Sequence, residues 1–159
     1  MRAATVRSVA AVLLVIYTVI IARLTLLPAS SETTTFGALN DAVAWLTRGG
    51  LDWTQIEALA NVALFVPAGF LLAVVLGRCW PGVLACVLAS GAIELAQGAF
   101  LPTRVPSWAD VEHNGLGGLV GALIAWPLVA WLRRRYRAEA GARAAAQPVM
   151  PVRTPSRAR

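Results

Sequence analysis

Lysine is absent from this sequence, histidine occurs once and cysteine occurs twice. A single histidine excludes a His-rich metal site. The two cysteines, Cys79 and Cys86, would lie about 10 Å apart along a shared helix axis, which is too far for an intrahelical disulfide. Zinc and redox chemistry therefore have little support, and we expect neither a metal nor a cofactor.

Charge is also scarce. Only 14% of the 159 residues are charged and 58% are hydrophobic, whereas soluble domains are about 25% charged and about 45–50% apolar. This composition excludes most soluble folds, and it excludes intrinsic disorder for most of the chain. The apolar residues are gathered in long blocks, so we expect a lipid bilayer as solvent and membrane lipids as the first partners.

The apolar blocks predict an all-α integral membrane bundle of four spans, each close to the roughly 20 residues that cross a bilayer. The predicted spans cover residues 8–27, 56–76, 81–101 and 108–132 of a transmembrane domain comprising residues 1–132. We expect residues 133–159 to form a disordered basic tail. The alternative for the first block is a cleaved signal peptide, but its apolar stretch is longer than usual for one.

The polar loop after the first span contains apolar residues at helical spacing. Phe36, Leu39, Val43 and Leu46 recur in this way, which predicts an amphipathic helix over residues 36–47 lying on the membrane surface. The alternative is an ordered loop with incidental periodicity.

All 14 basic residues are arginines, and their distribution predicts the orientation in the membrane. With the N-terminus inside, eleven arginines fall in inside segments and two, Arg48 and Arg104, fall outside. We therefore expect both termini to be cytoplasmic. The arginine run starting at Arg133 directly follows an apolar block, which favours anionic lipid over nucleic acid as its partner.

Several polar residues occupy positions within or beside the spans, where polar groups are costly and often mark function. We take as candidate ligand-binding residues Asn61, Glu94, Gln97, Arg104, Asp110 and Asn114. All of them fall in the predicted outer half of the membrane. They predict an outward-facing polar pocket, in which Arg104 pairs with Glu94 while Asn61 and Asn114 donate hydrogen bonds.

Small residues and a proline mark places where helices bend or approach closely. Pro67, followed by Gly69, cannot donate to the carbonyl of Ala63, which predicts a kink. Gly117 and Gly121 form a small-xxx-small pattern typical of close helix packing in lipid. The abundant glycine and alanine also make a homo-oligomer an open alternative to a single chain.

Four motifs in order resemble those of VanZ-like membrane proteins. The segment from Asn61 to Phe70 is similar to the N-x-x-x-F-x-P-x-G-F signature of that family, and residues 93–97 resemble its IE-x-x-Q motif. The family also has an Arg followed by an Asp and an Asn four residues apart and then a Gly. This pattern is matched by Arg104, Asp110, Asn114 and Gly117. The first span ends in Thr-Leu-Leu-Pro, similar to the family's T-L-x-P. The resemblance covers about residues 17–130, and Ser107 replaces an additional Asp that the family often has.

The resemblance implies a bacterial plasma-membrane protein connected with the cell envelope, since the name-giving member is associated with teicoplanin resistance. One hypothesis is an envelope factor that binds a lipid head group, a lipid-linked envelope precursor or a glycopeptide antibiotic. The alternative is an intramembrane enzyme with Glu94 as general acid or base. Ser107, Asp110 and His113 supply triad residue types, but a serine at a helix start turns to its own backbone. A purely structural element is the third hypothesis.

The predicted orientation can be tested with cysteines placed in a variant that lacks the native pair (Cys79→Ser, Cys86→Ala). We expect Thr47→Cys to react with a membrane-impermeant maleimide on intact cells, because the first loop is predicted to be external. Ser156→Cys should react only after permeabilisation. The reverse pattern would contradict the arginine-based orientation.

Overall fold

The computed structural model describes residues 3–26, 45, 50–100 and 106–146, and within these ranges it contains four helices and no strand. The helices are α1 (Ala3–Leu26), α3 (Trp53–Leu76), α4 (Cys79–Phe100) and α5 (Trp108–Ala146). Each is long and apolar enough to cross a membrane. The predicted all-α bundle with four spans is therefore confirmed, while the predicted helix over residues 36–47 lies outside the described residues, Trp45 excepted.

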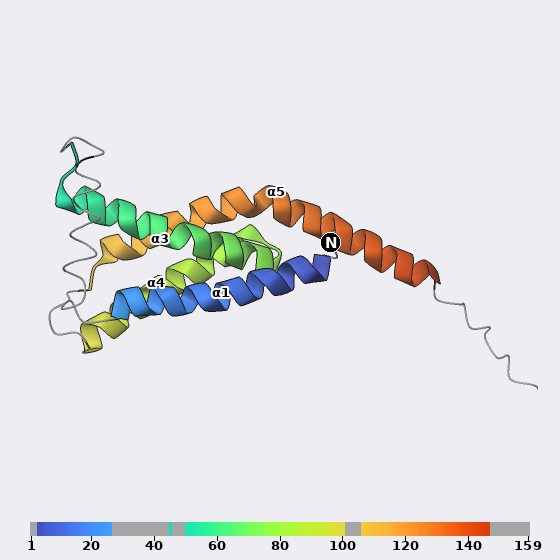
Figure 1. Ribbon diagram of the computed structural model, residues 1–159, viewed down its shortest axis with the longest axis horizontal. Helices are drawn as coiled ribbons and strands as arrows, with labels where there is room; N and C mark the ends of the chain where they lie inside the picture. Colours follow the sequence, from blue (N-terminus) through green and yellow to red (C-terminus); the bar gives the residue numbers. More distant parts are fainter. Residues whose placement is uncertain (1–2, 27–44, 46–49, 101–105, 147–159) are drawn as a thin grey trace, which may run out of the picture.

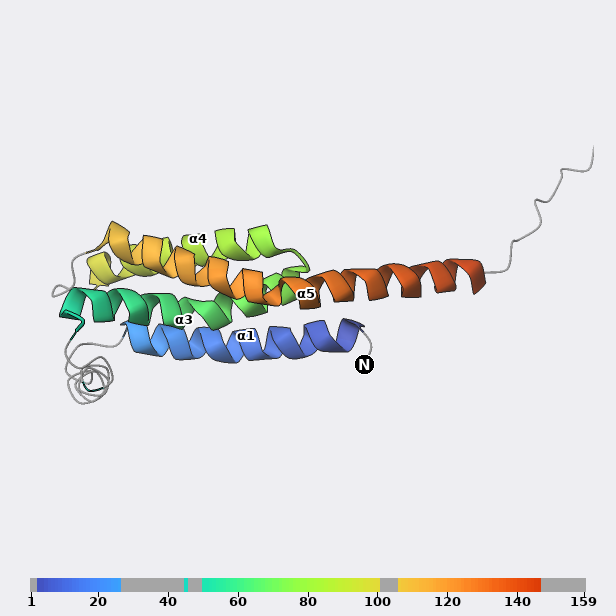
Figure 2. The same cartoon turned by 90° about the horizontal axis from the view of Figure 1, so that it is seen from above.

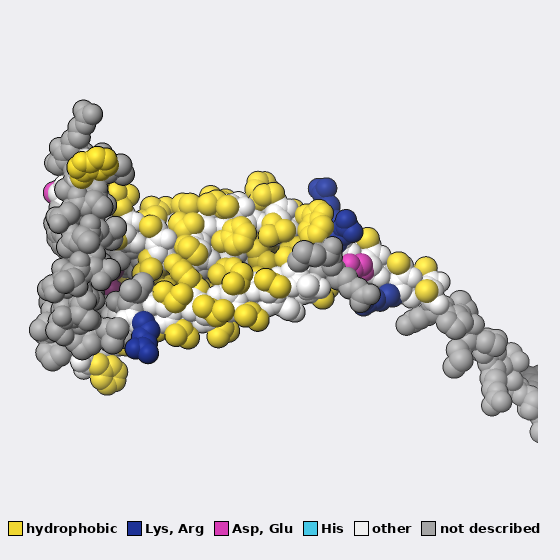
Figure 3. All heavy atoms as spheres, viewed as in Figure 1, with side chains coloured by type: hydrophobic (Ala, Val, Ile, Leu, Met, Phe, Trp, Pro, Cys, Tyr) yellow, Lys and Arg dark blue, Asp and Glu magenta, His cyan; other side chains and the backbone are white. Residues whose placement is uncertain are grey.

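The side chains are distributed as expected for a protein in lipid. Large aliphatic side chains are exposed along α1, and hydrophobic atoms cover the packed part of the molecule between its two ends (Figure 3). The buried residues, in contrast, include polar ones, namely Ser90, Glu94, Gln97 and Asn114. Since lipid tails solvate aliphatic groups and helix partners must satisfy polar groups, the chain is a multi-pass membrane protein.

The four helices run alternately up and down (Figures 1 and 2). We call the end where α1 begins and α3 turns into α4 the basic end, and the end where α1 stops and α5 begins the polar end. The α3–α5 contact is the most extensive, α4 packs on both of these helices, and α1 lies mainly against α3. The Tyr17 hydroxyl donates to the Leu64 carbonyl (2.7 Å), in the helical turn before Pro67, and so joins α1 to α3.

The cap at the N-terminus of α3 explains why the helix begins three residues before the predicted span, which started at residue 56. The Asp52 side chain accepts from the Gln55 amide (2.8 Å), and the Gln55 side chain accepts from the Asp52 amide (3.1 Å). Hydropathy alone misses such a capping turn. At the other end the helix stops at Leu76, as predicted, because Gly77 adopts the left-handed conformation (φ 65°) and its N–H donates to the Val74 carbonyl.

Glycines allow the backbones of α3 and α5 to touch. A Cβ on Gly117 would collide with the Val62 carbonyl, and one on Gly121 would collide with the Val66 carbonyl. One turn further along α3, Gly69 faces the backbone of Gly118. Such contacts bring main-chain atoms of two helices together, an arrangement that small residues permit in membranes.

The disorder expected for residues 133–159 requires a correction over residues 133–146, because α5 continues to Ala146. Residues 133–146 consist mainly of alanine and arginine, which favour helix, and contain no proline. The same composition that suggested a disordered tail therefore also permits a helix. Because residues 133–146 continue α5, they form helix without the cost of nucleating a new one. Figure 1 shows this extension leaving the bundle at the basic end. Residues 147–159 lie outside the described part of the chain.

We expect Gly121→Ala to destabilise the bundle by about 1–3 kcal/mol, because the added methyl group must push α3 and α5 apart. The matched control is Gly91→Ala on α4, where a Cβ would meet nothing within 4 Å. Unfolding of the purified protein in mixed micelles of dodecylmaltoside and SDS measures both variants. Equal stability of the two would contradict the close α3–α5 contact.

Candidate functional site

Five of the six predicted ligand-binding residues meet at the polar end of the bundle. Together with Ser90 they form what we call the polar cluster: Asn61, Ser90, Glu94, Gln97, Asp110 and Asn114. The sixth, Arg104, lies outside the described residues. Each member makes a hydrogen bond that leaves its own helix, so the cluster links all four helices at this end.

The α3–α5 pair contributes the first of these bonds. The Asn61 amide nitrogen donates to an Asp110 carboxylate oxygen (2.7 Å), and both side chains are half-buried. Asp110 lies in the first turn of α5, where the helix dipole also favours negative charge. The Asn61–Asp110 bond therefore fixes the N-terminal turns of α5 against α3.

Deeper in the bundle, α5 contacts α4 through a second asparagine. The Asn114 amide nitrogen donates to the Ser90 hydroxyl (2.8 Å); Asn114 is 6% exposed and Ser90 is fully buried. The Oδ1 atom of Asn114 is buried without a hydrogen-bond partner, as is the Nδ1 atom of the neighbouring His113. A buried acceptor without a donor costs free energy, so this place is suited to a group that brings one.

Glu94 and Gln97 extend the cluster from α4 toward the chain on either side. Glu94 is 8% exposed, and its Oε2 accepts from the Ser107 backbone N–H (2.8 Å), just before α5 begins. Gln97 donates to the Thr25 carbonyl at the end of α1 (2.7 Å). Asn61 and Asn114, which we expected to donate to Glu94, donate to Asp110 and to Ser90, respectively.

The residues predicted for helix packing and the kink lie on α3 and α5. Pro67 and Gly69 lie within α3, while Gly117 and Gly121 on α5 contact the α3 backbone between Val62 and Phe70. Sequence reasoning missed Ser90, although it lies four residues before Glu94 on the same helix face. It also missed the Ser107 amide, which no side-chain pattern could reveal.

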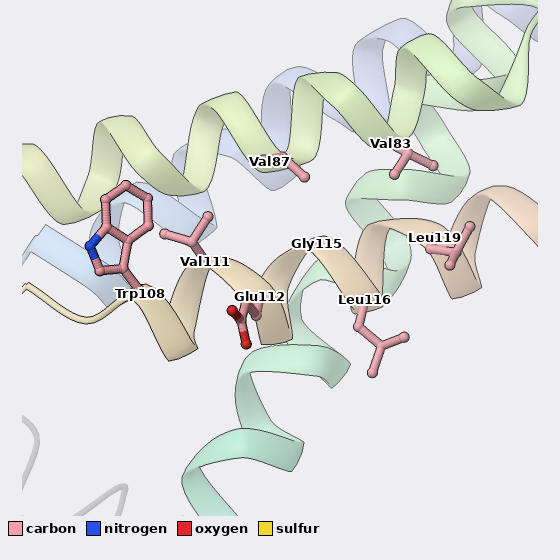
Figure 4. Close-up of a pocket in the computed structure, with 8 residues that line it drawn as sticks. All are labelled: Val83, Val87, Trp108, Val111, Glu112, Gly115, Leu116 and Leu119. Carbon is pink, nitrogen blue, oxygen red and sulfur yellow. The ribbon is translucent and has the colours of Figure 1, made fainter.

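A groove of about 450 Å³ lies elsewhere, on the outer side of the α4–α5 contact (Figure 4). It contains no predicted site residue and is lined by valines and leucines, with Gly115, Trp108 and Glu112. In Figure 4 the Trp108 ring and the Val111 side chain lie at one end, and Leu119 lies at the other. Within the described residues, no three His, Cys, Asp or Glu side chains lie close enough to hold a metal ion.

Comparison with known proteins agrees with the motifs. The model of the VanZ/LLP1 family matches residues 14–132, which include α3, α4, parts of α1 and α5, and every residue of the polar cluster. No curated protein and no solved structure matches the chain.

We expect the losses in free energy of unfolding caused by Asn61→Ala and Asp110→Ala to be less than additive, since either change removes the same hydrogen bond. The coupling should be about 1 kcal/mol, within the range for interhelical bonds in membranes. Unfolding of the two single variants and the double variant in mixed micelles measures it. The pair Asn61→Ala and Glu112→Ala is the control and should be additive, because Glu112 lines the groove on α5.

Proposed function

The chain belongs to the VanZ/LLP1 family, and on this premise we propose that it is an envelope factor of the bacterial plasma membrane whose polar cluster binds a polar head group. The head group belongs to an envelope lipid or lipid-linked precursor, or to a lipoglycopeptide such as teicoplanin, and binding contributes to teicoplanin resistance. Both termini lie in the cytoplasm in this proposal, so the cluster faces outward.

The unpartnered Oδ1 of Asn114 is the observation that carries the proposal. This atom accepts no hydrogen bond although Asn114 already contacts Ser90 and lies among other interhelical polar bonds. Head groups of envelope lipids and glycopeptides are rich in hydroxyl and amide N–H donors. A donor of this kind would satisfy Oδ1 and remove the cost of burying it alone.

Arg104 supplies the complementary charge in this proposal. It lies between α4 and α5 in the sequence, close to the cluster residues that end one helix and begin the next. A guanidinium binds phosphate or carboxylate through two parallel N–H bonds. A ligand with an anionic group and several hydroxyls therefore fits Arg104 and the cluster together.

The enzymatic alternative rests on Glu94. It is a buried carboxyl group that accepts a backbone N–H bond, and a carboxyl group held in this way could act as a general acid or base toward a lipid-linked substrate. Arg104 would then stabilise developing negative charge. The two functions differ in how far they depend on the ionisable group of Glu94.

The first test is teicoplanin susceptibility of a sensitive bacterial host, with vancomycin alongside, at matched membrane abundance of each variant. We expect wild-type protein to protect, and Asn114→Ala and Arg104→Ala to abolish protection. Glu112→Gln is the control, since it removes a carboxylate that lies outside the cluster. Equal protection by the wild type and both cluster variants would overturn the proposal.

Glu94→Gln separates the binding function from the enzymatic one. If the cluster only binds, a glutamine still forms hydrogen bonds and affinity should fall about tenfold, the equivalent of about 1.4 kcal/mol. If Glu94 transfers a proton, turnover should fall by about 10²–10⁴-fold. Protection is measured over a range of teicoplanin doses at several expression levels. Weaker binding shifts the dose at which protection fails, whereas loss of turnover abolishes protection at every dose.

A further inference from the structure

Arg7 occupies a defined place at the basic end, opposite the polar cluster. Its guanidinium lies 4.8 Å from the centre of the Tyr136 ring on α5. A terminal nitrogen occupies the place that a Cβ on Gly77 would take, so a side chain at this position would displace it. Three segments of the chain therefore meet around one cation: the start of α1, the turn between α3 and α4, and α5 where it leaves the bundle.

The charge of Arg7 is only partly compensated. Its Nε is buried without a hydrogen-bond acceptor. Among the described residues no carboxylate lies within 4 Å of the guanidinium, which instead contacts the Tyr136 ring. Arg7 as a whole is half-buried, and its terminal nitrogens, unlike Nε, are not sealed from solvent. These nitrogens therefore have a defined position and no anionic partner in the described part of the chain.

The surroundings attract anions. Near this end the described residues include Arg78 and five arginines after Leu132, whereas Glu139 is the one acidic residue beyond position 112 of the chain. Arginine side chains gather visibly where α5 leaves the bundle (Figure 3). A partly buried guanidinium held on an aromatic ring keeps its fork of donors in place, and that fork matches two oxygens of a phosphate.

We propose that Arg7, held by Tyr136 and Gly77, is a binding site for a phosphate group, with the head group of an anionic phospholipid as its source. The terminal nitrogens of Arg7 donate to the phosphate oxygens, and the surrounding arginines raise the local concentration of anionic lipid. The site lies at the opposite end of the bundle from the polar cluster and does not depend on the function proposed for that cluster.

Native mass spectrometry of the full-length protein with phosphatidylglycerol tests the proposal. We expect Arg7→Gln to raise the Kd of the tightest lipid about tenfold, since a bidentate charged contact is lost. Arg143→Gln is the matched control: it removes one charge about 10 Å further along α5 than Tyr136, beyond one Debye length at physiological salt. Equal losses in the two variants would overturn the proposal, because they would indicate diffuse attraction.

A second variant keeps the charge and moves the guanidinium. Gly77→Asn tolerates the left-handed backbone conformation but places a side chain where Arg7 lies. We expect it to weaken phosphatidylglycerol binding as Arg7→Gln does, and unchanged affinity would contradict the proposed geometry. Phosphatidylcholine, with no net charge, should bind the wild type more weakly.

Inorganic phosphate distinguishes the two sources of the ligand. If it leaves phosphatidylglycerol bound when both are present at equal concentration, the lipid source is supported. If it displaces the lipid and itself binds in an Arg7-dependent way, a free phosphate is the ligand and the lipid source is overturned.

Discussion

The contact between the backbones of α3 and α5 determines how the rest of the bundle is arranged. Gly117 and Gly121 bring α5 onto the carbonyls of α3, and Gly118 leaves room for Cys86 of α4 on the other side. A larger residue at these positions would separate the helices by more than a hydrogen bond can span. The bonds from Asn61 to Asp110 and from Asn114 to Ser90 thus depend on glycines located one or two turns away.

The polar end and the basic end are stabilised by different interactions. At the polar end, polar side chains form hydrogen bonds that leave their own helices, since lipid offers them no partner. At the basic end, Arg7 stacks on Tyr136 and Arg135 lies 5.1 Å from the Trp131 ring. The first arrangement fixes the helices relative to one another, and the second fixes cations at the membrane surface.

The sequence predicts the four spans because long apolar runs have few structures open to them in lipid. It also points to Asn61, Glu94, Gln97, Asp110 and Asn114, since polar residues in such runs must find partners inside the bundle. It does not reveal which partner each one takes: the Ser107 amide carries no side-chain signal, and Ser90 is common enough in membrane helices to attract no attention. The site of Arg7 requires knowing that residues 7, 77 and 136 meet, which no local pattern encodes.

The helical extension of α5 has a mechanical consequence. Val129 and Leu132 are still buried in the core of the bundle, and Tyr136 still contacts Arg7, so the projecting part of α5 begins after Tyr136. The ten residues from Arg137 to Ala146 extend about 15 Å beyond that point. Because they continue a helix that packs against α3 and α4, a tilt of α5 in the bundle would displace the arginines on this extension with it.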